Sequence, residues 1–331
     1  MRNPAKKILL LFLAIIIPLS CSACWFFGSD DPQEPNDELH IIELATEFVP
    51  LTRSAPAVPI VLMPEAPGRL VERNSKATID YSNTVNGYVM VKWQTRTSSQ
   101  LRVLVTGPEG TVYTYVIHPN DKFEVFPLSD GNGRYTVGVF EQVPDGRYAR
   151  ALSKDFTVRL NDEFAPFLRP NQYVNFDRDS KAVEKAAELV TGKRDLIDKV
   201  AAIYDYVITN FTYDTKLAED ITKGIVTQYL PDLDSVFESK KGICFDYAAL
   251  MTAMLRSQDI PTKLVVGFVG EVKHAWISVY SEESGWIDRV IFFDGKEWTR
   301  MDPTFASTAT NVASLRRFIG DGSNYVTTHL Y

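Results

Sequence analysis

The chain has 331 residues, of which 45% are hydrophobic and 23% are charged, and its formal net charge at pH 7 is -7. This composition is typical of globular protein, and the length suits two domains of ordinary size. The acidic balance and the lack of a long basic run argue against a nucleic-acid partner, because such binding depends on clustered Lys and Arg that neutralise phosphates.

Residues 1–24 have the layout of an export signal. A positively charged start precedes an apolar run over 8–19, which is too short for a comfortable membrane span. The small residues that follow resemble the lipobox of bacterial lipoproteins, with Cys24 preferred over Cys21 as the lipidated residue; ordinary cleavage and release stay open. The sequence therefore predicts an exported protein at the cell surface, anchored by lipid to the bacterial membrane.

The segment 25–70 has the composition of a tether. It begins acidic and then becomes rich in proline, at Pro50, Pro56, Pro59, Pro64 and Pro67. Such composition favours an extended linker, so we expect a tether that is ordered only where it meets the next domain.

Residues 71–162 show the pattern of a small β-sandwich. Short β-branched and aromatic segments recur between turn signals such as Gly107-Pro108, and this spacing is typical of packed antiparallel sheets. We interpret His118 as a solvated loop residue. The segment shows no catalytic constellation, so we expect a structural or ligand-presenting role for this domain. The strands are expected at 88–93, 101–105, 111–116, 135–140 and 155–160.

Residues 163–331 change to helical periodicity and then return to strands. Helices followed by strands predict an α+β domain. The third helix is apolar on most sides and should be buried, and 211–233 reads as a loop with a short helix. The helices are expected at 180–191, 195–210 and 244–257, and the strands at 263–269, 273–280 and around 297–301.

Cys244 is the only cysteine outside the signal region, so it cannot form an intrachain disulfide in the exported chain. It begins the buried helix, where unpaired N–H groups and the helix dipole favour a thiolate. The N–H groups there, with that of Ile243 among them, are candidate donors to an oxyanion. The scattered cysteines and histidines have no metal-ligand spacing, so we expect neither a metal nor another cofactor.

His274 is the candidate partner of this thiol. It lies near the start of an alternating strand and shares one face with Trp276, opposite the aliphatic residues. A histidine can protonate a leaving group, and a carboxylate on its far nitrogen fixes the ring tautomer. The strand that returns beside His274 decides which carboxylate this is. A return just before Asp302 favours that residue, an earlier return favours Asp294, and spacing leaves both open.

Four motifs in the C-terminal half belong together: Gly242-x-Cys244-x-Asp246-Tyr247-Ala248, Arg256 with Ile260-Pro261, His274-Ala275-Trp276, and Trp298-x-x-Met301-Asp302-Pro303-Thr304. As a set they resemble the bacterial transglutaminase-like domain of the papain-like thiol enzymes, over about 182–305. The resemblance implies that Cys244 is the nucleophile, His274 the base and acid, and Asp302 the orienting carboxylate. The long insertion 281–295, between the histidine and aspartate strands, departs from the family pattern and leaves the substrate class open.

The sequence therefore predicts an exported acyl-transfer enzyme that works through a thioester on a protein or peptide substrate, which we expect to be associated with the cell wall. Cysteine protease or amidase activity is preferred over cross-linking, and deamidation uses the same triad. The alternative is an inert surface binding or scaffold lipoprotein, in which the sandwich carries the binding. Tyr247 and Trp276 are expected either to line the thiol pocket or to pack in the core.

Overall fold

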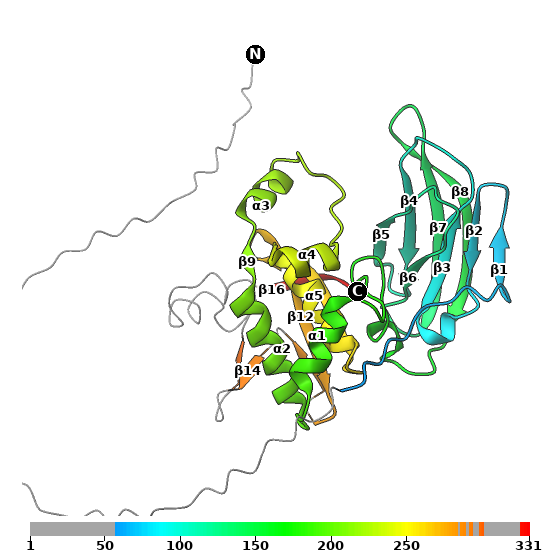
Figure 1. The fold of residues 1–331 in the computed structure, drawn as a ribbon. Helices are drawn as coiled ribbons and strands as arrows, with labels where there is room; N and C mark the ends of the chain where they lie inside the picture. Colours follow the sequence, from blue (N-terminus) through cyan, green and yellow to red (C-terminus); the bar gives the residue numbers. More distant parts are fainter. Residues whose placement is uncertain (1–56, 284, 289–290, 294–297, 301–324) are drawn as a thin grey trace, which may run out of the picture. The chain divides into compact units, whose positions relative to one another are not determined.

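The computed structural model describes residues 57–283, 285–288, 291–293, 298–300 and 325–331, which belong to one compact unit, Thr52–Tyr331 (Figure 1). A strand-rich part comes first, and helices with further strands follow it. The predicted α+β fold class with a preceding strand-rich region is confirmed.

The strand-rich part contains β1 (Val71–Arg73), β2 (Ala77–Asp80), β3 (Tyr88–Trp93), β4 (Leu101–Thr106), β5 (Val112–Val116), β6 (Glu124–Pro127), β7 (Gly133–Gln142) and β8 (Tyr148–Val158). They form two antiparallel sheets with the orders β1-β2-β3-β6 and β5-β4-β7-β8. In β4, Leu101, Val103 and Val105 are buried and the residues between them are half-buried, which is the alternation of a sheet with one covered face. Buried residues of both sheets belong to one apolar cluster, as in a sandwich.

The second part contains the α-helices α1 (Lys181–Val190), α2 (Leu196–Asn210), α3 (Thr215–Thr222), α4 (Leu233–Ser239) and α5 (Cys244–Arg256). Its strands are β9 (Thr212–Tyr213), β10 (Lys241–Gly242), β11 (Thr262–Val269), β12 (Val272–Ser281), β13 (Gly285–Asp288), β14 (Ile291–Phe293), β15 (Trp298–Arg300) and β16 (Tyr325–Leu330). One sheet has the order β13-β12-β11-β16, and two-stranded pairs form between β9 and β10 and between β14 and β15. The short helix predicted in 211–233 is α3.

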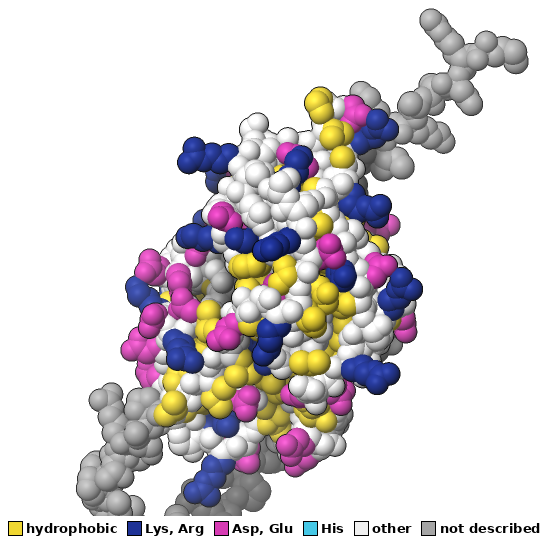
Figure 2. All heavy atoms as spheres, turned by 90° about the vertical axis from the view of Figure 1, so that its right-hand side faces the viewer, with side chains coloured by type: hydrophobic (Ala, Val, Ile, Leu, Met, Phe, Trp, Pro, Cys, Tyr) yellow, Lys and Arg dark blue, Asp and Glu magenta, His cyan; other side chains and the backbone are white. Residues whose placement is uncertain are grey.

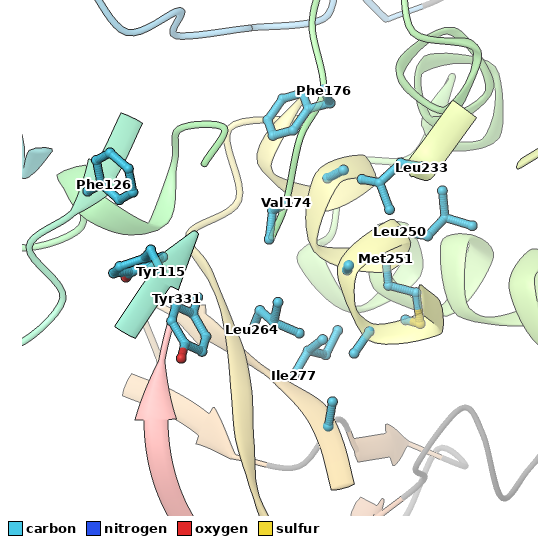
Figure 3. Packing of buried hydrophobic residues seen from close by; sticks show 14 of the residues in the cluster. Tyr115, Phe126, Val174, Phe176, Leu233, Leu250, Met251, Leu264, Ile277 and Tyr331 are labelled. Atoms are coloured by element: carbon cyan, nitrogen blue, oxygen red, sulfur yellow. The ribbon is translucent and has the colours of Figure 1, made fainter. Parts of the chain in front are cut away.

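The helix α5 is the centre of the C-terminal core. From its third residue onward every side chain is buried, as its apolar composition predicts. Figure 3 shows Met251 of α5 on the side of Ile277 of β12 and Leu250 beside Leu233 of α4, all within the same apolar cluster. The helix that begins at Cys244 and the strand that carries His274 are therefore packed neighbours.

Arg256, at the end of α5, is a fully buried cation. Its guanidinium donates to the backbone carbonyls of Thr262 at 2.8 and 3.0 Å, Arg169 at 2.6 Å and Tyr331 at 2.7 Å. Burial lowers the pKa of this guanidinium to about 9, so it is still charged at neutral pH. One side chain therefore ties together the segment before α1, the start of β11 and the residue after β16.

Aromatic side chains join the strand-rich part to the α+β part. Tyr173, which precedes α1, contacts Tyr115 of β5 and Phe245 of α5, with 5.5 Å between ring centroids in both pairs. His329 of β16 places its Nε2 3.2 Å from the Val112 carbonyl oxygen of β5. The residue that follows Cys244 therefore packs on a tyrosine that also touches the sandwich.

The segment 57–70 is held by hydrogen bonds to both parts. The Ile60 amide donates to the Ser257 carbonyl at 2.8 Å, beside the end of α5. Further along, the Gly68 amide donates to Asp80 Oδ2 of β2 at 2.6 Å. The last residues of the predicted tether are therefore packed against the fold.

Acidic and basic side chains are interspersed on the face shown in Figure 2, with apolar side chains between them. None of the helices in the described part of the chain has the length and apolar character needed to cross a membrane. The predicted signal, 1–24, and its candidate lipidation residues Cys21 and Cys24 lie outside the described residues.

Candidate thiol active site

Cys244 is partly exposed and is the first residue of α5. The chain reaches it through Lys240, whose left-handed backbone (φ 55°) ends α4, and through β10, which pairs in parallel with β9. The Asp214 amide donates to the Gly242 carbonyl at 2.8 Å and fixes the strand just before the helix. Ile243 is extended, so the helix begins sharply at the cysteine. Cys244 therefore lies at the N-terminal end of a buried helix, where the helix dipole favours negative charge.

The contacts of Asp246 explain why the cysteine motif has an aspartate at 246 and a glycine at 242. Its Oδ2 accepts a hydrogen bond from the backbone N–H of Ile243 at 2.8 Å, which satisfies a donor that the helix leaves unpaired. The side chain then lies against Gly242, where an added Cβ would be 2.7 Å from Asp246 Cβ and 2.9 Å from Oδ2. The N–H of Ile243, a predicted oxyanion donor, is thus engaged by a carboxylate. The remaining candidate donors in this turn are the N–H groups of Cys244 and Phe245.

The second oxygen of Asp246 is also engaged. Tyr229, in the loop between α3 and α4, donates to Asp246 Oδ1 at 2.7 Å. Burial raises the pKa of Asp246, while the hydrogen bonds from Ile243 and Tyr229 oppose that rise. Burial and the nearby carboxylate raise the pKa of Tyr229, so its phenol is a donor at neutral pH. The two side chains form a hydrogen-bonded link two residues from Cys244.

His274 lies in β12 and is 6% exposed. Its ring stacks on that of Trp276, with 6.4 Å between centroids. The residue opposite it in β11 is Gly267, where an added Cβ would be 2.0 Å from the Val326 carbonyl oxygen and 2.7 Å from the Trp276 ring. The imidazole is therefore held by packing within a sheet, and the strand next to it requires glycine.

Tyr247 and Trp276 are both buried, with exposed fractions of 1% and 2%. Tyr247 contacts Phe211, with 6.2 Å between ring centroids. Trp276 belongs to a small apolar cluster with Val265, Val269 and Tyr325, apart from the main core. These contacts are packing contacts, and Trp276 also supports the ring of the candidate base; a role of either residue toward substrate stays a prediction.

The strands around β12 bear on the choice of carboxylate. β12 is flanked by β11 and, over 278–281, by β13. The strand predicted around 297–301 is observed as β15, which pairs with β14. The insertion 281–295 therefore contains the earlier return, which by strand pairing favours Asp294, whereas the family resemblance favours Asp302. Asp294 and Asp302 both lie outside the described residues, so the assignment of Asp302 stays a prediction.

Two parts of the site have no counterpart in the sequence analysis. Tyr229 contacts Asp246 across a loop, and no spacing rule links two residues so placed. β16 was also missed, although the β-branched run at Val326, Thr327 and Thr328 favours a strand. Both features depend on segments that meet only in the folded chain.

A polar groove of about 820 Å³ lies on the sandwich and is separate from the thiol. Its lining includes Arg69, Arg73, Asn74, Lys92 and Gln94. Within the described ranges, no three or more His, Cys, Asp or Glu side chains are grouped so that they could hold a metal ion. The groove is a candidate binding surface on the sandwich.

Comparison with known proteins gives one family match. Residues 183–303 match the profile of the Transglutaminase-like superfamily. Uncharacterized protein YebA of Bacillus subtilis (strain 168) is 32% identical over 179 residues, which are 47% of this chain and 22% of that protein. The chain thus spans less than a quarter of this relative's length.

Two solved structures show more distant similarity. A candidate cysteine protease from Cytophaga hutchinsonii is 17% identical, with 74% of this chain and 83% of that chain covered and a TM-score of 0.32. Red sea bream transglutaminase is 14% identical, with 70% of this chain and 51% of that chain covered and a TM-score of 0.25. The family match over 183–303 contains Cys244, His274 and Asp302.

Proposed function

We propose that this protein, whose residues 183–303 form a transglutaminase-like domain, is a thiol enzyme that transfers acyl groups from peptide or carboxamide substrates. One observation carries the proposal. Cys244 is partly exposed at the first turn of α5, and this helix packs on the strand that holds His274. Contact between the helix that carries the thiol and the strand that carries the imidazole supports a thiol–imidazole pair of the kind that thioester chemistry uses.

In the proposed reaction the Cys244 thiolate attacks the carbonyl carbon. A C–S bond forms, the C–N bond breaks, and His274 donates a proton to the leaving amine. We assign the stabilisation of the oxyanion to the N–H groups of Cys244 and Phe245. Water or an amine then attacks the thioester and loses its proton to His274; a C–O or C–N bond forms, the C–S bond breaks, and the thiolate and imidazolium are regenerated. Asp302 is assigned to orient the imidazole.

Hydrolysis of a peptide or amide is the preferred outcome, since no dedicated amine site is visible in the sequence. Deamidation and isopeptide cross-linking need the same thioester and differ only in the acyl donor and acceptor. Incubation with a mixture of extracellular peptides, followed by mass spectrometry of the trapped Cys244 thioester, would identify the acyl group. Release of free acid, as opposed to an amide product, would establish water as the acceptor.

The test of the activated thiol needs no substrate. We expect limiting iodoacetamide at neutral pH to label Cys244 faster than free cysteine, and the His274→Ala variant to lose most of this advantage. Labelling at the rate of free cysteine, unchanged in His274→Ala, would contradict the proposal. Cys244→Ser is the matched control, because it keeps the shape of the side chain and removes the reactive sulfur.

A second candidate function, a binding lipoprotein with an inert thiol domain, is favoured by the polar groove on the sandwich. Arg69 and Arg73 line this groove and take part in no ion pair among the described residues. Binding of cell-wall fragments that is lost in Arg73→Ala but kept in Cys244→Ser would support this function. Binding that is kept in Arg73→Ala but lost in Cys244→Ser would support the enzyme.

Export and lipid anchoring complete the proposal and rest on the composition of residues 1–24. We assign the lipid to Cys24 and place the protein at the surface of the bacterial membrane. Metabolic labelling with a radioactive fatty acid should be lost in Cys24→Ala and kept in Cys21→Ala. The opposite pattern would move the lipid to Cys21, and labelling of neither would favour cleavage and release.

A further inference from the structure

A side chain of the loop between α3 and α4, that of Tyr229, reaches the thiol site. Tyr229 donates its phenol proton to Asp246 Oδ1 at 2.7 Å, and Asp246 Oδ2 accepts the Ile243 N–H at 2.8 Å. Ile243 is the residue before Cys244, and Asp246 is the third residue of α5. Two consecutive hydrogen bonds therefore connect a loop that is distant in sequence to the turn that carries the thiol.

The burial of Asp246 makes this link sensitive to its partners. The side chain is 0% exposed, so each oxygen depends on a protein donor in place of water. Gly242 leaves room for the carboxylate on one side, which fixes its position against the Ile243 N–H. Loss of the Tyr229 donor would leave one buried oxygen unpaired and free the carboxylate to turn or to take up a proton.

The loop is itself anchored beyond the site. Gln228 has a left-handed backbone (φ 57°) and donates through Nε2 to Gln100 Oε1 at 3.3 Å, before β4 of the sandwich. At the start of the loop, Gly224 also has a positive φ of 70°. Neighbouring residues, Gln228 and Tyr229, thus face different partners, one in the sandwich and one in the catalytic helix.

We propose that Tyr229 is a positioning residue of the thiol site, which acts through Asp246 to hold the first turn of α5 in the geometry that Cys244 needs. The inference rests on the proposed function. The α3–α4 loop then helps to set the reactivity of the thiol. The hydrogen bond between Gln228 and Gln100 anchors this loop to the sandwich.

The test compares Tyr229→Phe with the wild-type protein in two assays. Tyr229→Phe keeps the ring and removes only the hydroxyl. We expect alkylation of Cys244 by iodoacetamide at neutral pH to slow by roughly tenfold, which is the effect of one hydrogen bond of ordinary strength. The midpoint of the alkylation–pH curve should move to higher pH. With p-nitrophenyl acetate as acyl donor, kcat should fall while KM stays within about twofold.

A double variant separates positioning from general destabilisation. Tyr229→Phe and Asp246→Asn break the same link, so the slowing in the double variant should match the larger single effect and not the product of both. Tyr135→Phe is the matched control, because it removes a hydroxyl that donates to the Gly131 carbonyl at 3.1 Å inside the sandwich. It should leave the alkylation rate and its pH dependence unchanged.

The outcomes distinguish the two proposals. A wild-type thiol no more reactive than free cysteine overturns the proposed function and this inference with it. An activated wild-type thiol whose rate and pH curve are unchanged in Tyr229→Phe overturns the positioning role alone. A midpoint that moves to lower pH also overturns it, since relief of repulsion by the Asp246 charge would then dominate.

Discussion

Replacement of Gly242 by alanine should damage the thiol site without touching any reacting group. The added Cβ would lie 2.7 Å from Asp246 Cβ, 2.9 Å from its Oδ2 and 3.2 Å from its Cγ. Carbon atoms in contact prefer about 3.5–4.0 Å, so the carboxylate must move away from the Ile243 N–H. Gly242→Ala should therefore combine an overpacking cost of about 1–3 kcal/mol with the loss of a charge-assisted hydrogen bond of about 1.5–3 kcal/mol.

The expected loss in the free energy of unfolding is thus about 2.5–6 kcal/mol, a large share of the stability of an ordinary domain. Urea unfolding followed by circular dichroism would measure it, and iodoacetamide labelling of the still-folded protein would report slower reaction of Cys244. Gly110→Ala is the control: φ there is +88° and nothing lies within 4 Å of the added Cβ. It should show only the backbone cost of an L-residue at positive φ, about 1–2 kcal/mol.

A double-mutant cycle tests the assigned cause. Asp246→Gly removes all three atoms that the new Cβ would meet, so in that background Gly242→Ala should cost less than about 1 kcal/mol. The reasoning is refuted if the full cost persists in the Asp246→Gly background. It is also refuted if Gly242→Ala alone is as stable as the wild type and labels at the same rate.

Three further predictions concern the frame around the site. Arg256→Leu removes the guanidinium from the carbonyls of Arg169, Thr262 and Tyr331, of which the last still accepts from the Leu264 N–H. It should lower the free energy of unfolding by about 3 kcal/mol in urea titrations, with Arg256→Lys recovering part of it. Gly267→Ala would place a Cβ 2.0 Å from the Val326 carbonyl oxygen; it should separate β16 from β11 and raise hydrogen exchange at Val326, whereas unchanged exchange would contradict the packing described beside His274. Burial raises the pKa of Tyr173 from 10.0 to about 12, so the native state keeps a proton that the unfolded state loses. The contribution of Tyr173 to the free energy of unfolding should be fully present below about pH 10, and roughly 3 kcal/mol of it should be lost as the pH rises to about 12. In a spectrophotometric titration, the phenolate absorbance of Tyr173 should appear at a higher pH in the native protein than in protein unfolded by urea.

Local pattern was sufficient to predict the elements that carry Cys244 and His274, the two proposed reacting groups. α5 is apolar on most sides and follows a glycine and an extended residue, so its start at Cys244 and its burial could both be predicted. The alternation in β12 likewise separated His274 and Trp276 from the aliphatic residues of the main core. These features depend on period and on neighbours in sequence, which is the information that a single sequence contains.

Pairing between distant segments could not be predicted in the same way. The partner of β12 over 278–281 is β13, while β15 pairs with β14. Short strands of similar composition contain no local signal that predicts which of them will pair. The same holds for the hydrogen bond between Tyr229 and Asp246, because the loop before α4 has no periodicity to fix its path. Partner choice is decided by the whole fold, so the register around His274 needs the structure.

The path of the segment 57–70 bears on how this protein can be divided. The chain contacts the end of α5 at Ser257, crosses to the sandwich at Asp80, and returns only after the sandwich to form the helices of the thiol part. A fragment that begins at 163 would lack the strand-like contact of Ile60 and expose the ring of Tyr173 that packs on β5. The boundary between the sandwich and the thiol part is therefore a poor place to cut, and transfer of the thiol part to another protein would have to include the sandwich and the segment 57–70.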